Sequence, residues 1–342
     1  MPLLKKVKTE DAVGLVVGHD MTKTIPGVYD GPRFRRGDVI KKEDIPELLS
    51  MGKEHIYVIE KEEDQVHEEE AAIRIAGASA GKNISTTAPR QGRVNLKATV
   101  DGIIKINKSL LYEIHSIEDI IIATRHNNAT CKAGEIVAGT KIIPLFTTEE
   151  NLKKLESLCK DQGKVVDVLP FLPKEVGIII TGNEIFKGIT EDKFAAVMRR
   201  KIEKLGSDVI SEVIVPDDED IIAKAILDMK NKGCDVIVTC GGLSVDPDDV
   251  TVEGVEKSGA KIISNGVPVM PGAMVLVAEL GDIPILGAPG AVIFKKTTII
   301  DVLIPRILAG DKITRQDIVE LAHGGMCLDC EECIFPVCPF GK

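Results

Sequence analysis

Apolar runs alternate with segments of helical spacing from Val176 onward, and this alternation constrains the fold more than any other feature of the chain. Residues 176–180, 209–215 and 236–239 indicate strands, and an unbroken apolar run such as the first is typical of a strand covered on both faces. Between them, apolar residues recur at the three- or four-residue spacing of an amphipathic helix. Alternation of strand and helix predicts a mostly parallel sheet with helices on both sides. We therefore expect a three-layer αβα domain in this part of the chain.

The loop after the third strand combines a Gly-Gly pair with three aspartates. Glycine lets a ligand approach the main chain closely, and the helix that starts near Val250 directs unpaired N–H groups back at the loop, which favours phosphate binding. Aspartates there would repel a phosphate unless a cation lay between them, and Mg²⁺ suits carboxylates together with phosphate oxygens. The alternative is that one aspartate caps the helix and the others are solvated. The candidate residues are Thr239, Gly241, Gly242, Leu243, Ser244, Asp246, Asp248 and Asp249.

Four further loops fall on or near the same predicted rim of the sheet. In such sheets ligands bind beyond the carboxyl ends of the strands. Each loop alone has a structural explanation, because Thr-Gly and Pro-Gly form turns and Asp218 is a good N-cap. Their recurrence on one rim favours a shared site. The loops are Thr181-Gly182-Asn183-Glu184, Pro216-Asp217-Asp218, Pro268-Val269-Met270-Pro271-Gly272 and Gly287-Ala288-Pro289-Gly290.

Four cysteines lie within twelve residues near the end of the chain, in the pattern Cys327-x2-Cys330-x2-Cys333-x4-Cys338-Pro339. So many thiols in a short segment are hard to bury as plain hydrophobic residues, so metal binding is favoured. Zinc takes four thiolates in a closed tetrahedron. The spacing is also close to the ferredoxin run Cys-x2-Cys-x2-Cys-x3-Cys-Pro, and is one residue longer in the last gap. Zinc and an iron–sulfur cluster both remain open; Cys240, inside the glycine loop, is interpreted as inert packing.

The length of 342 residues is sufficient for two or three domains. The first half predicts a β-rich mixture with a few helices, and residues 161–174 form the best boundary. We expect a small mixed α/β (SAF-like) domain at 1–66, a β-rich domain and linker at 67–173, the αβα domain at 174–312 and a Cys-rich metal-binding tail at 313–342.

The charge, the hydropathy and the first residues of the chain indicate which partners and which compartment to expect. A net charge of −10 argues against binding to nucleic acid or to an anionic membrane, and no stretch reaches the roughly 18 apolar residues of a membrane span. The first residues lack the features of a signal peptide, so the protein is expected to be cytoplasmic. In that compartment the cysteines are thiols or metal ligands.

The loop motifs, in this order and spacing, resemble the molybdopterin-binding domain shared by the MogA, MoaB, MoeA and gephyrin group and by CinA-like proteins. The resemblance covers about residues 176–310, and 68–145 more loosely resemble MoeA-type proteins. It implies a site for the phosphate-bearing pterin dithiolene, molybdopterin, with Mg²⁺ supporting either adenylation by ATP, which leaves an AMP moiety, or molybdate insertion. Relatives form dimers or trimers, so a homo-oligomer is expected.

Carried over by motif, the resemblance assigns three acids and two sets of loop residues. Glu184, Asp218 and Asp249 are implied for metal binding and catalysis. Gly241, Gly242, Leu243 and Ser244 would cradle phosphate. The floor and remaining walls would come from Thr181, Gly182, Asn183, Thr239, Asp246, Asp248, Pro271, Gly272, Pro289 and Gly290.

Two motifs depart from the MoeA pattern. Its Pro-Gly-Lys-Pro is Pro271-Gly272-Ala273-Met274 here, and its Pro-Gly-Asn-Pro is Pro289-Gly290-Ala291-Val292. Loss of the lysine weakens the case for molybdate insertion more than that for pterin binding. Three hypotheses follow: a transferase of molybdenum cofactor assembly, a non-catalytic cofactor carrier that serves a molybdoenzyme client, and a CinA-like nucleotide pyrophosphatase.

Overall fold

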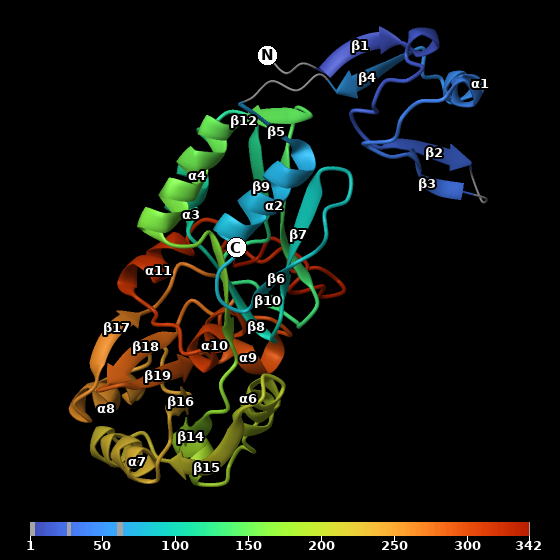
Figure 1. The fold of residues 1–342 in the computed structure, drawn as a ribbon. Helices are drawn as coiled ribbons and strands as arrows, with labels where there is room; N and C mark the ends of the chain where they lie inside the picture. The colour runs from blue at the N-terminus through green and yellow to red at the C-terminus, as the bar shows by residue number, and fades with distance from the viewer. Residues whose placement is uncertain (1–3, 26–28, 60–63, 342) are drawn as a thin grey trace. The chain divides into compact units, whose positions relative to one another are not determined.

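The computed structural model describes residues 4–25, 29–59 and 64–341, which form two compact units (Figure 1). The first unit takes its described residues from 1–99, 106–125 and 134–167, and the second from 100–105, 126–133 and 168–341. Both units are therefore assembled from non-consecutive segments. Parts of the expected 1–66 domain, namely 1–3, 26–28 and 60–63, lie outside the described residues. No helix in the described ranges is long and apolar enough to cross a membrane.

The first part of the first unit is built from two small antiparallel pairs of strands. β1 pairs with β4 and β2 pairs with β3. Ala12, Val17, Leu48 and Ile56 belong to the buried core of this part. The bounds are β1 (Leu4–Lys8), β2 (Met21–Ile25), β3 (Tyr29–Phe34), α1 (Ile45–Ser50) and β4 (His55–Ile59), with two single-turn helices at Thr9–Asp11 and Lys42–Asp44.

The remainder of the first unit contains a four-stranded antiparallel sheet in the order β6-β7-β11-β9, and β5 pairs with β12. The Thr140 hydroxyl of β11 donates to the Ala72 carbonyl of α2 at 3.1 Å, and Arg74 of α2 bonds Glu149 and Glu156 of α4. The bounds are β5 (Gln65–His67), α2 (Glu68–Ser79), β6 (Ile84–Thr86), β7 (Arg93–Ala98), α3 (Lys108–Ile114), β9 (Ile120–Thr124), β11 (Ile136–Ile142), β12 (Phe146–Thr148) and α4 (Glu149–Gln162).

The second unit contains a six-stranded sheet in the order β15-β14-β16-β19-β18-β17. The first four of these strands run parallel, and β18 and β17 are antiparallel to their neighbours. The strands are β14 (Glu175–Thr181), β15 (Asp208–Val215), β16 (Val236–Cys240), β17 (Lys261–Asn265), β18 (Leu276–Leu280) and β19 (Ile283–Ala288). A three-stranded sheet has the order β10-β8-β13, with β8 (Gly102–Ile106), β10 (Thr130–Cys131) and β13 (Val166–Pro170).

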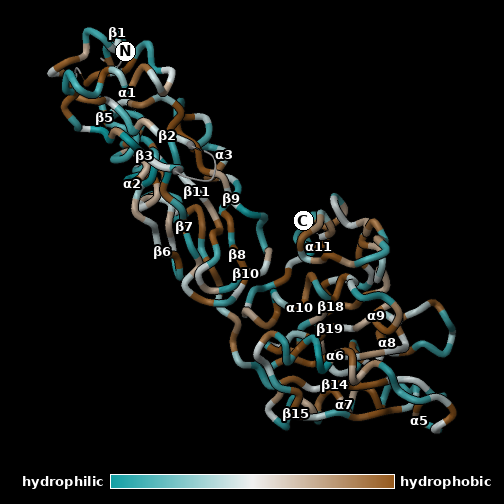
Figure 2. The backbone as a smooth tube through the Cα atoms, turned by 90° about the vertical axis from the view of Figure 1, so that its right-hand side faces the viewer, coloured by the Kyte–Doolittle hydropathy of each residue, from teal (hydrophilic) through white to brown (hydrophobic). Residues whose placement is uncertain are grey.

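Helices cover both faces of the six-stranded sheet, which confirms the predicted αβα class. Ile178 and Ile180 of β14 belong to the core that includes residues of α6 and α10, whereas Ile179 belongs to the core under α7 and α8. The apolar run of β14 is unbroken because both faces of this strand are buried. The hydrophobic residues of β18, β19 and α10 are brown in Figure 2. The helices are α5 (Asn183–Phe186), α6 (Phe194–Glu203), α7 (Glu219–Asn231), α8 (Thr251–Lys257), α9 (Ala291–Phe294), α10 (Ile300–Leu308) and α11 (Arg315–Glu320).

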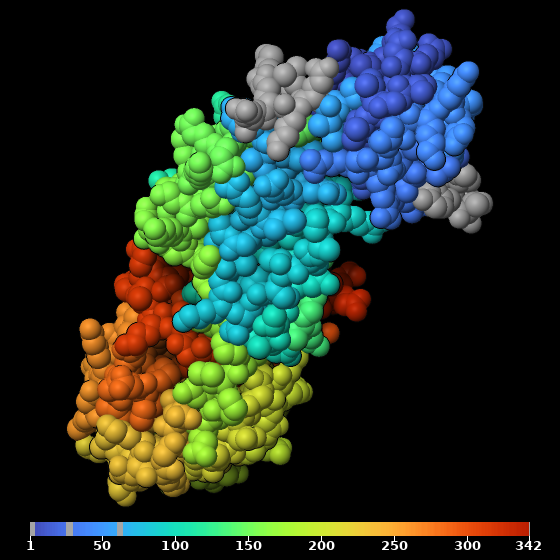
Figure 3. Space-filling view, viewed as in Figure 1, coloured from blue at the N-terminus to red at the C-terminus, as the bar shows by residue number. Residues whose placement is uncertain are grey.

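A buried arginine connects α10 to α11. The Arg306 guanidinium bonds Asp311 at 2.6 Å and Asp317 at 2.8 Å. Arg315 of α11 donates to the Ser264 hydroxyl of β17, and Figure 3 shows the red atoms of the α11 region against the orange atoms of β17. The segment that carries the four cysteines therefore starts from a fixed helix.

The substitution Asp311→Ala tests the ion pairs that Asp311 makes with the buried Arg306 and with Lys105. It removes one of two carboxylates from a buried guanidinium, so we expect the free energy of unfolding to fall by about 3 kcal/mol in urea denaturation. Asp228→Ala, on the exposed face of α7, is the control and should change stability by less than about 0.5 kcal/mol. Equal losses in the two variants would contradict the role of the pair.

Candidate functional site

The carboxyl ends of three parallel strands meet at one edge of the six-stranded sheet. Ile180 of β14 is paired with Cys240 of β16, and Cys240 with Ala288 of β19. The loops that follow therefore come together, as expected for this class of sheet. The loops after β16 and β19, together with the segment before β18, enclose a hollow of about 340 Å³, here called the diglycine hollow; the loop after β14 does not line it. Its lining residues are Gly241, Gly242, Leu243, Ser244, Asp249, Gly272, Ala273, Met274, Ala288, Pro289, Gly290 and Ala291.

The Gly241-Gly242 turn needs glycine at both positions. Gly241 has φ +98° and Gly242 has φ +59°, a region that other residues rarely adopt. A Cβ on Gly241 would meet the Thr181 carbonyl, and one on Gly242 would meet the Thr251 hydroxyl. The turn therefore packs directly on β14 and on the first turn of α8.

Two buried threonines, Thr181 and Thr251, stabilise this turn by hydrogen bonds. The Thr181 hydroxyl donates to the Cys240 carbonyl at 3.3 Å and lies 3.0 Å from the Thr251 hydroxyl, which donates to the Gly241 carbonyl at 3.1 Å. Thr181 thus supports the floor of the hollow without lining it. Thr239 is fully buried in β16, and its hydroxyl has no hydrogen-bond partner among the described residues.

The three aspartates of the loop have different positions. Asp249 lines the hollow, and its Oδ2 accepts a hydrogen bond from the Ser244 N–H at 2.8 Å. The Oδ1 of Asp246 accepts from the Asp248 N–H at 3.1 Å, and both of these residues are exposed. The main chain at Ser244 therefore already binds an anionic oxygen.

The adjacent residues Asp217 and Asp218 divide two roles. The Asp218 carboxylate caps α7 by accepting from the N–H groups of Asp220 and Ile221 at 2.9 and 3.0 Å. Asp217 instead accepts from the Asn183 N–H at 2.7 Å, and its Oδ1 is buried without a hydrogen-bond partner in the described ranges. Asp217 was not among the site residues predicted from the sequence. The two successive acids were nevertheless a signal, because only one of them can cap the helix and the other is left for a different role.

Asp217 belongs to an acidic group beside the diglycine hollow. Burial raises the pKa of Asp217, and the negative charges of Glu184, Asp249 and Asp248 raise it further. Glu184, at the start of α5, is therefore close enough to act on Asp217 by charge, although neither residue lines the hollow itself.

The structure brings only part of the predicted set together. The predicted residues that line the diglycine hollow are Gly241, Gly242, Leu243, Ser244, Asp249, Gly272, Pro289 and Gly290. Those outside its lining are Thr181, Gly182, Asn183, Glu184, Asp218, Thr239, Asp246, Asp248 and Pro271. Ala273, Met274, Ala288 and Ala291 also line it; they belong to the quoted loop motifs but were not selected as site residues.

The donor set is chemically suited to a magnesium ion. Carboxylates are ligands that Mg²⁺ prefers, and a cation would relieve the mutual repulsion that acts on Asp217. In residues 4–25, 29–59 and 64–341, no three His, Cys, Asp or Glu side chains are arranged to hold a metal ion by themselves. Mg²⁺ is usually bound by one or two carboxylates together with substrate phosphates, so it does not require such a cage.

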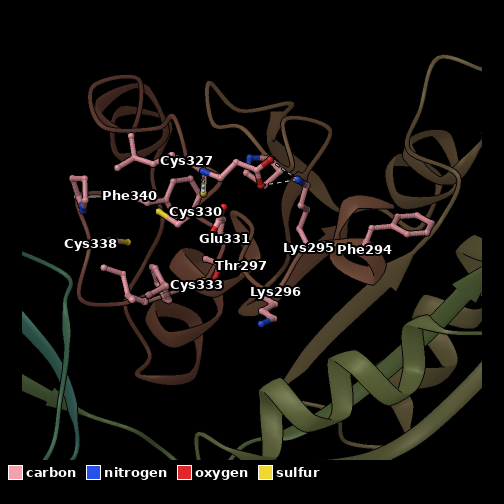
Figure 4. Close-up of a pocket in the computed structure, with 16 residues that line it drawn as sticks. Phe294, Lys295, Lys296, Thr297, Cys327, Cys330, Glu331, Cys333, Cys338 and Phe340 are labelled. Atoms are coloured by element: carbon pink, nitrogen blue, oxygen red, sulfur yellow. Dashed lines mark hydrogen bonds and ion pairs between the residues drawn. The ribbon is translucent and has the colours of Figure 1, made fainter.

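The four cysteines of the tail line a second hollow, of about 260 Å³, here called the cysteine hollow (Figure 4). All four are free thiols; Cys330 and Cys333 are exposed, and Cys327 and Cys338 are half-buried. Hydrogen bonds with the Thr297 hydroxyl and the Phe335 N–H lower the pKa of the Cys333 thiol. By contrast, burial raises the pKa of Cys240, which agrees with its interpretation as inert packing.

Comparison with known families identifies two segments of the chain. Residues 177–309, which include every lining residue of the diglycine hollow, match the family described as a probable molybdopterin binding domain. Residues 6–60 match a domain of unknown function.

Curated relatives match only a short part of the chain. A molybdopterin adenylyltransferase of Pyrococcus furiosus is 33% identical over 90 residues, which are 26% of this chain and 53% of that protein. A CinA-like protein of Amoebophilus asiaticus is 32% identical over 80 residues, 23% of this chain and 19% of that protein. The chain thus spans only a fifth to about a third of these relatives' lengths: 19% of the CinA-like protein, and 35% and 31% of two further relatives.

Among solved structures, the molybdopterin biosynthesis enzyme MoaB of Thermus thermophilus is similar to 40% of this chain over 98% of its own length. The identity is 21% and the TM-score is 0.34.

The substitution Asp217→Asn tests the acidic group. Because the folded-state pKa of Asp217 is raised, its stabilising contribution is present below the unfolded-state pKa and is lost as pH rises through the folded-state pKa. We therefore expect the variant to match the wild type in Tm at about pH 4 and to exceed it at about pH 7. Parallel Tm curves for Asp217→Asn and the wild type would contradict the assignment.

Proposed function

We propose that the chain binds molybdopterin in the diglycine hollow and transfers an adenylyl group to its phosphate, on the premise that residues 177–309 form a domain of the molybdopterin-binding family. One observation carries this proposal. Loops from the carboxyl ends of the parallel strands β16 and β19, together with the segment before β18, enclose a hollow with a glycine turn on one side and acidic residues beside it. A phosphorylated ligand with a divalent cation fits that division of charge.

The glycine turn supports the phosphate part of the proposal. The Ser244 N–H already donates to a carboxylate oxygen of Asp249, so a phosphate oxygen can take the same position. Leu243, which is buried, and Ala288 supply apolar contact for the remainder of the ligand. A volume of about 340 Å³ lies in the range of small-molecule sites.

One or two of the carboxylates of Asp217, Glu184 and Asp249 would hold Mg²⁺ together with phosphate oxygens of the substrates. When bound, the ion neutralises phosphate charge that the acidic group would otherwise repel. The orphan Oδ1 of Asp217 supplies a ligand that needs no hydrogen bond to be broken. Asp218 would act indirectly, because its carboxylate is held by the start of α7 and keeps the neighbouring Asp217 in place.

The proposed reaction needs orientation more than acid–base chemistry. An oxygen of the pterin phosphate attacks the α-phosphorus of ATP, a new phosphorus–oxygen bond forms, and the α–β anhydride bond breaks to release pyrophosphate. The main chain of 241–244 would position the attacking phosphate, and the acidic group would position the ATP phosphates through the cation.

A second function, carriage of the cofactor without turnover, is favoured by one side chain. Ala273 lines the diglycine hollow where MoeA-type members carry a lysine. Without that cation the site has less to attract molybdate, and binding alone would suffice for delivery to a molybdoenzyme.

Incubation of the full chain with ATP, Mg²⁺ and molybdopterin distinguishes these functions. We expect release of pyrophosphate that needs all three components, and Asp249→Asn should abolish release. Tight binding of molybdopterin without pyrophosphate would favour the carrier. Hydrolysis of a dinucleotide to AMP without molybdopterin would favour the pyrophosphatase and overturn adenylyl transfer.

A charge placed at Gly290 tests the location of the site. Gly290 lines the hollow, and a Cβ there would meet no atom within 4 Å, so a side chain can be added without a clash. We expect Gly290→Asp to weaken molybdopterin binding by about tenfold more than Gly290→Asn, because only the first repels phosphate. Equilibrium binding measures the difference, and unchanged Tm values show that both variants are folded. Equal binding by the two variants would place the phosphate elsewhere.

A further inference from the structure

The four tail cysteines face one hollow although they lie in a segment without helix or strand. The cysteine hollow is closed on its other sides by Pro271 and by residues 294–297 (Figure 4). Lys295 bonds Asp329 at 2.7 Å, and the Thr297 hydroxyl lies 3.1 Å from Cys333 Sγ. The cysteine segment is therefore fastened to the end of α9 and the residues after it.

The main chain repeats one hydrogen bond at two of the cysteines. The Asp329 N–H donates to Cys327 Sγ at 3.5 Å, and the Phe335 N–H donates to Cys333. In both cases the donor is two residues after the sulfur. Such N–H···S bonds orient sulfur ligands and stabilise their negative charge when a metal is bound.

The cysteine hollow has room for a group larger than a single ion. Four thiolates around one zinc ion, at Zn–S distances of about 2.3 Å, lie about 3.8 Å from one another and leave no space between them. Here the four cysteines line about 260 Å³ together with other residues of the tail and of 294–297, and no three His, Cys, Asp or Glu side chains of the described residues are arranged to hold a metal ion. An iron–sulfur cluster brings its own iron and sulfide atoms and needs ligands spaced around a larger volume.

We infer that the cysteine hollow binds a [4Fe–4S] cluster through Cys327, Cys330, Cys333 and Cys338. The spacing, one residue longer than the ferredoxin run in its last gap, still ends in Cys338-Pro339. The aromatic rings of Phe335 and Phe340 line the hollow and would reduce the exposure of the cluster to water.

The cluster would share walls with the diglycine hollow. Pro271 lines the cysteine hollow and the next residue, Gly272, lines the diglycine hollow; likewise Phe294 and Ala291 are at opposite ends of α9. The Cys327 N–H donates to the Met270 carbonyl at 2.8 Å, so a ligand residue is bonded directly to this shared loop. Occupation of the cysteine hollow therefore fixes one wall of the diglycine hollow, an inference that rests on the proposed function for its pterin part.

Metal and sulfide analysis of the full chain, purified without oxygen, tests the cluster. We expect about four irons and about four acid-labile sulfides per chain with a broad visible absorption band, and loss of all three in Cys333→Ser. Cys159→Ala, which changes a buried cysteine of α4, is the control and should keep them. Zinc without sulfide, or a chain without metal, would overturn the inference. Alkylation of the wild type supplies a test without variants: the four tail thiols should react only after a chelator has removed the iron.

Molybdopterin binding to the cluster-loaded and the cluster-free chain tests the shared wall. We expect at least about fivefold tighter binding to the loaded chain, the lower end of typical coupling between sites. Equal dissociation constants would overturn the coupling and leave the cluster in place. Absence of binding by both forms would contradict the proposed function, and the metal analysis would still decide the cluster.

Discussion

The contact between Thr181 and Thr251 underlies the arrangement of the site. These buried hydroxyl groups join the end of β14 to the start of α8 and donate to two successive carbonyls, those of Cys240 and Gly241. An unmade buried hydrogen bond costs about 1–3 kcal/mol, so the turn is held strongly in one conformation. Glycine is required above them because any Cβ would meet one of the two threonine residues. The hollow thus exists because two strands, one helix and one side-chain-free turn fit a single arrangement.

The sequence was informative where one physical cause dominates. Burial on both faces produces an unbroken apolar run, so β14 and β16 could be predicted, and parallel strands then place their loops on one rim. The reversal of β18 could not be predicted, because the local pattern of a short strand does not encode its direction. The catalytic role of Asp218 stays a prediction; the structure shows that Asp218 caps α7 while Asp217 accepts from Asn183, a division that sequence spacing alone does not contain.

For the cysteine segment, too, only part of the site could be predicted from the sequence. The spacing of Cys327, Cys330, Cys333 and Cys338 predicts a shared metal centre, and the structure places all four around one hollow. The other walls come from Pro271 and from residues 294–297, which lie 30 or more residues earlier in the chain. Their contribution depends on tertiary packing, so the size and lining of the hollow could not be predicted from the spacing.

The loop at Met270–Gly272 gives the C-terminal segment a constraint on its evolution and engineering. Met270 bonds to Gly325 and Cys327, Pro271 lines the cysteine hollow, and Gly272 lines the diglycine hollow. An insertion or deletion in this loop would disturb both hollows at once. The cysteine segment therefore cannot be transferred to another scaffold by itself, since Pro271 and residues 294–297, which line the same hollow, belong to the parent domain.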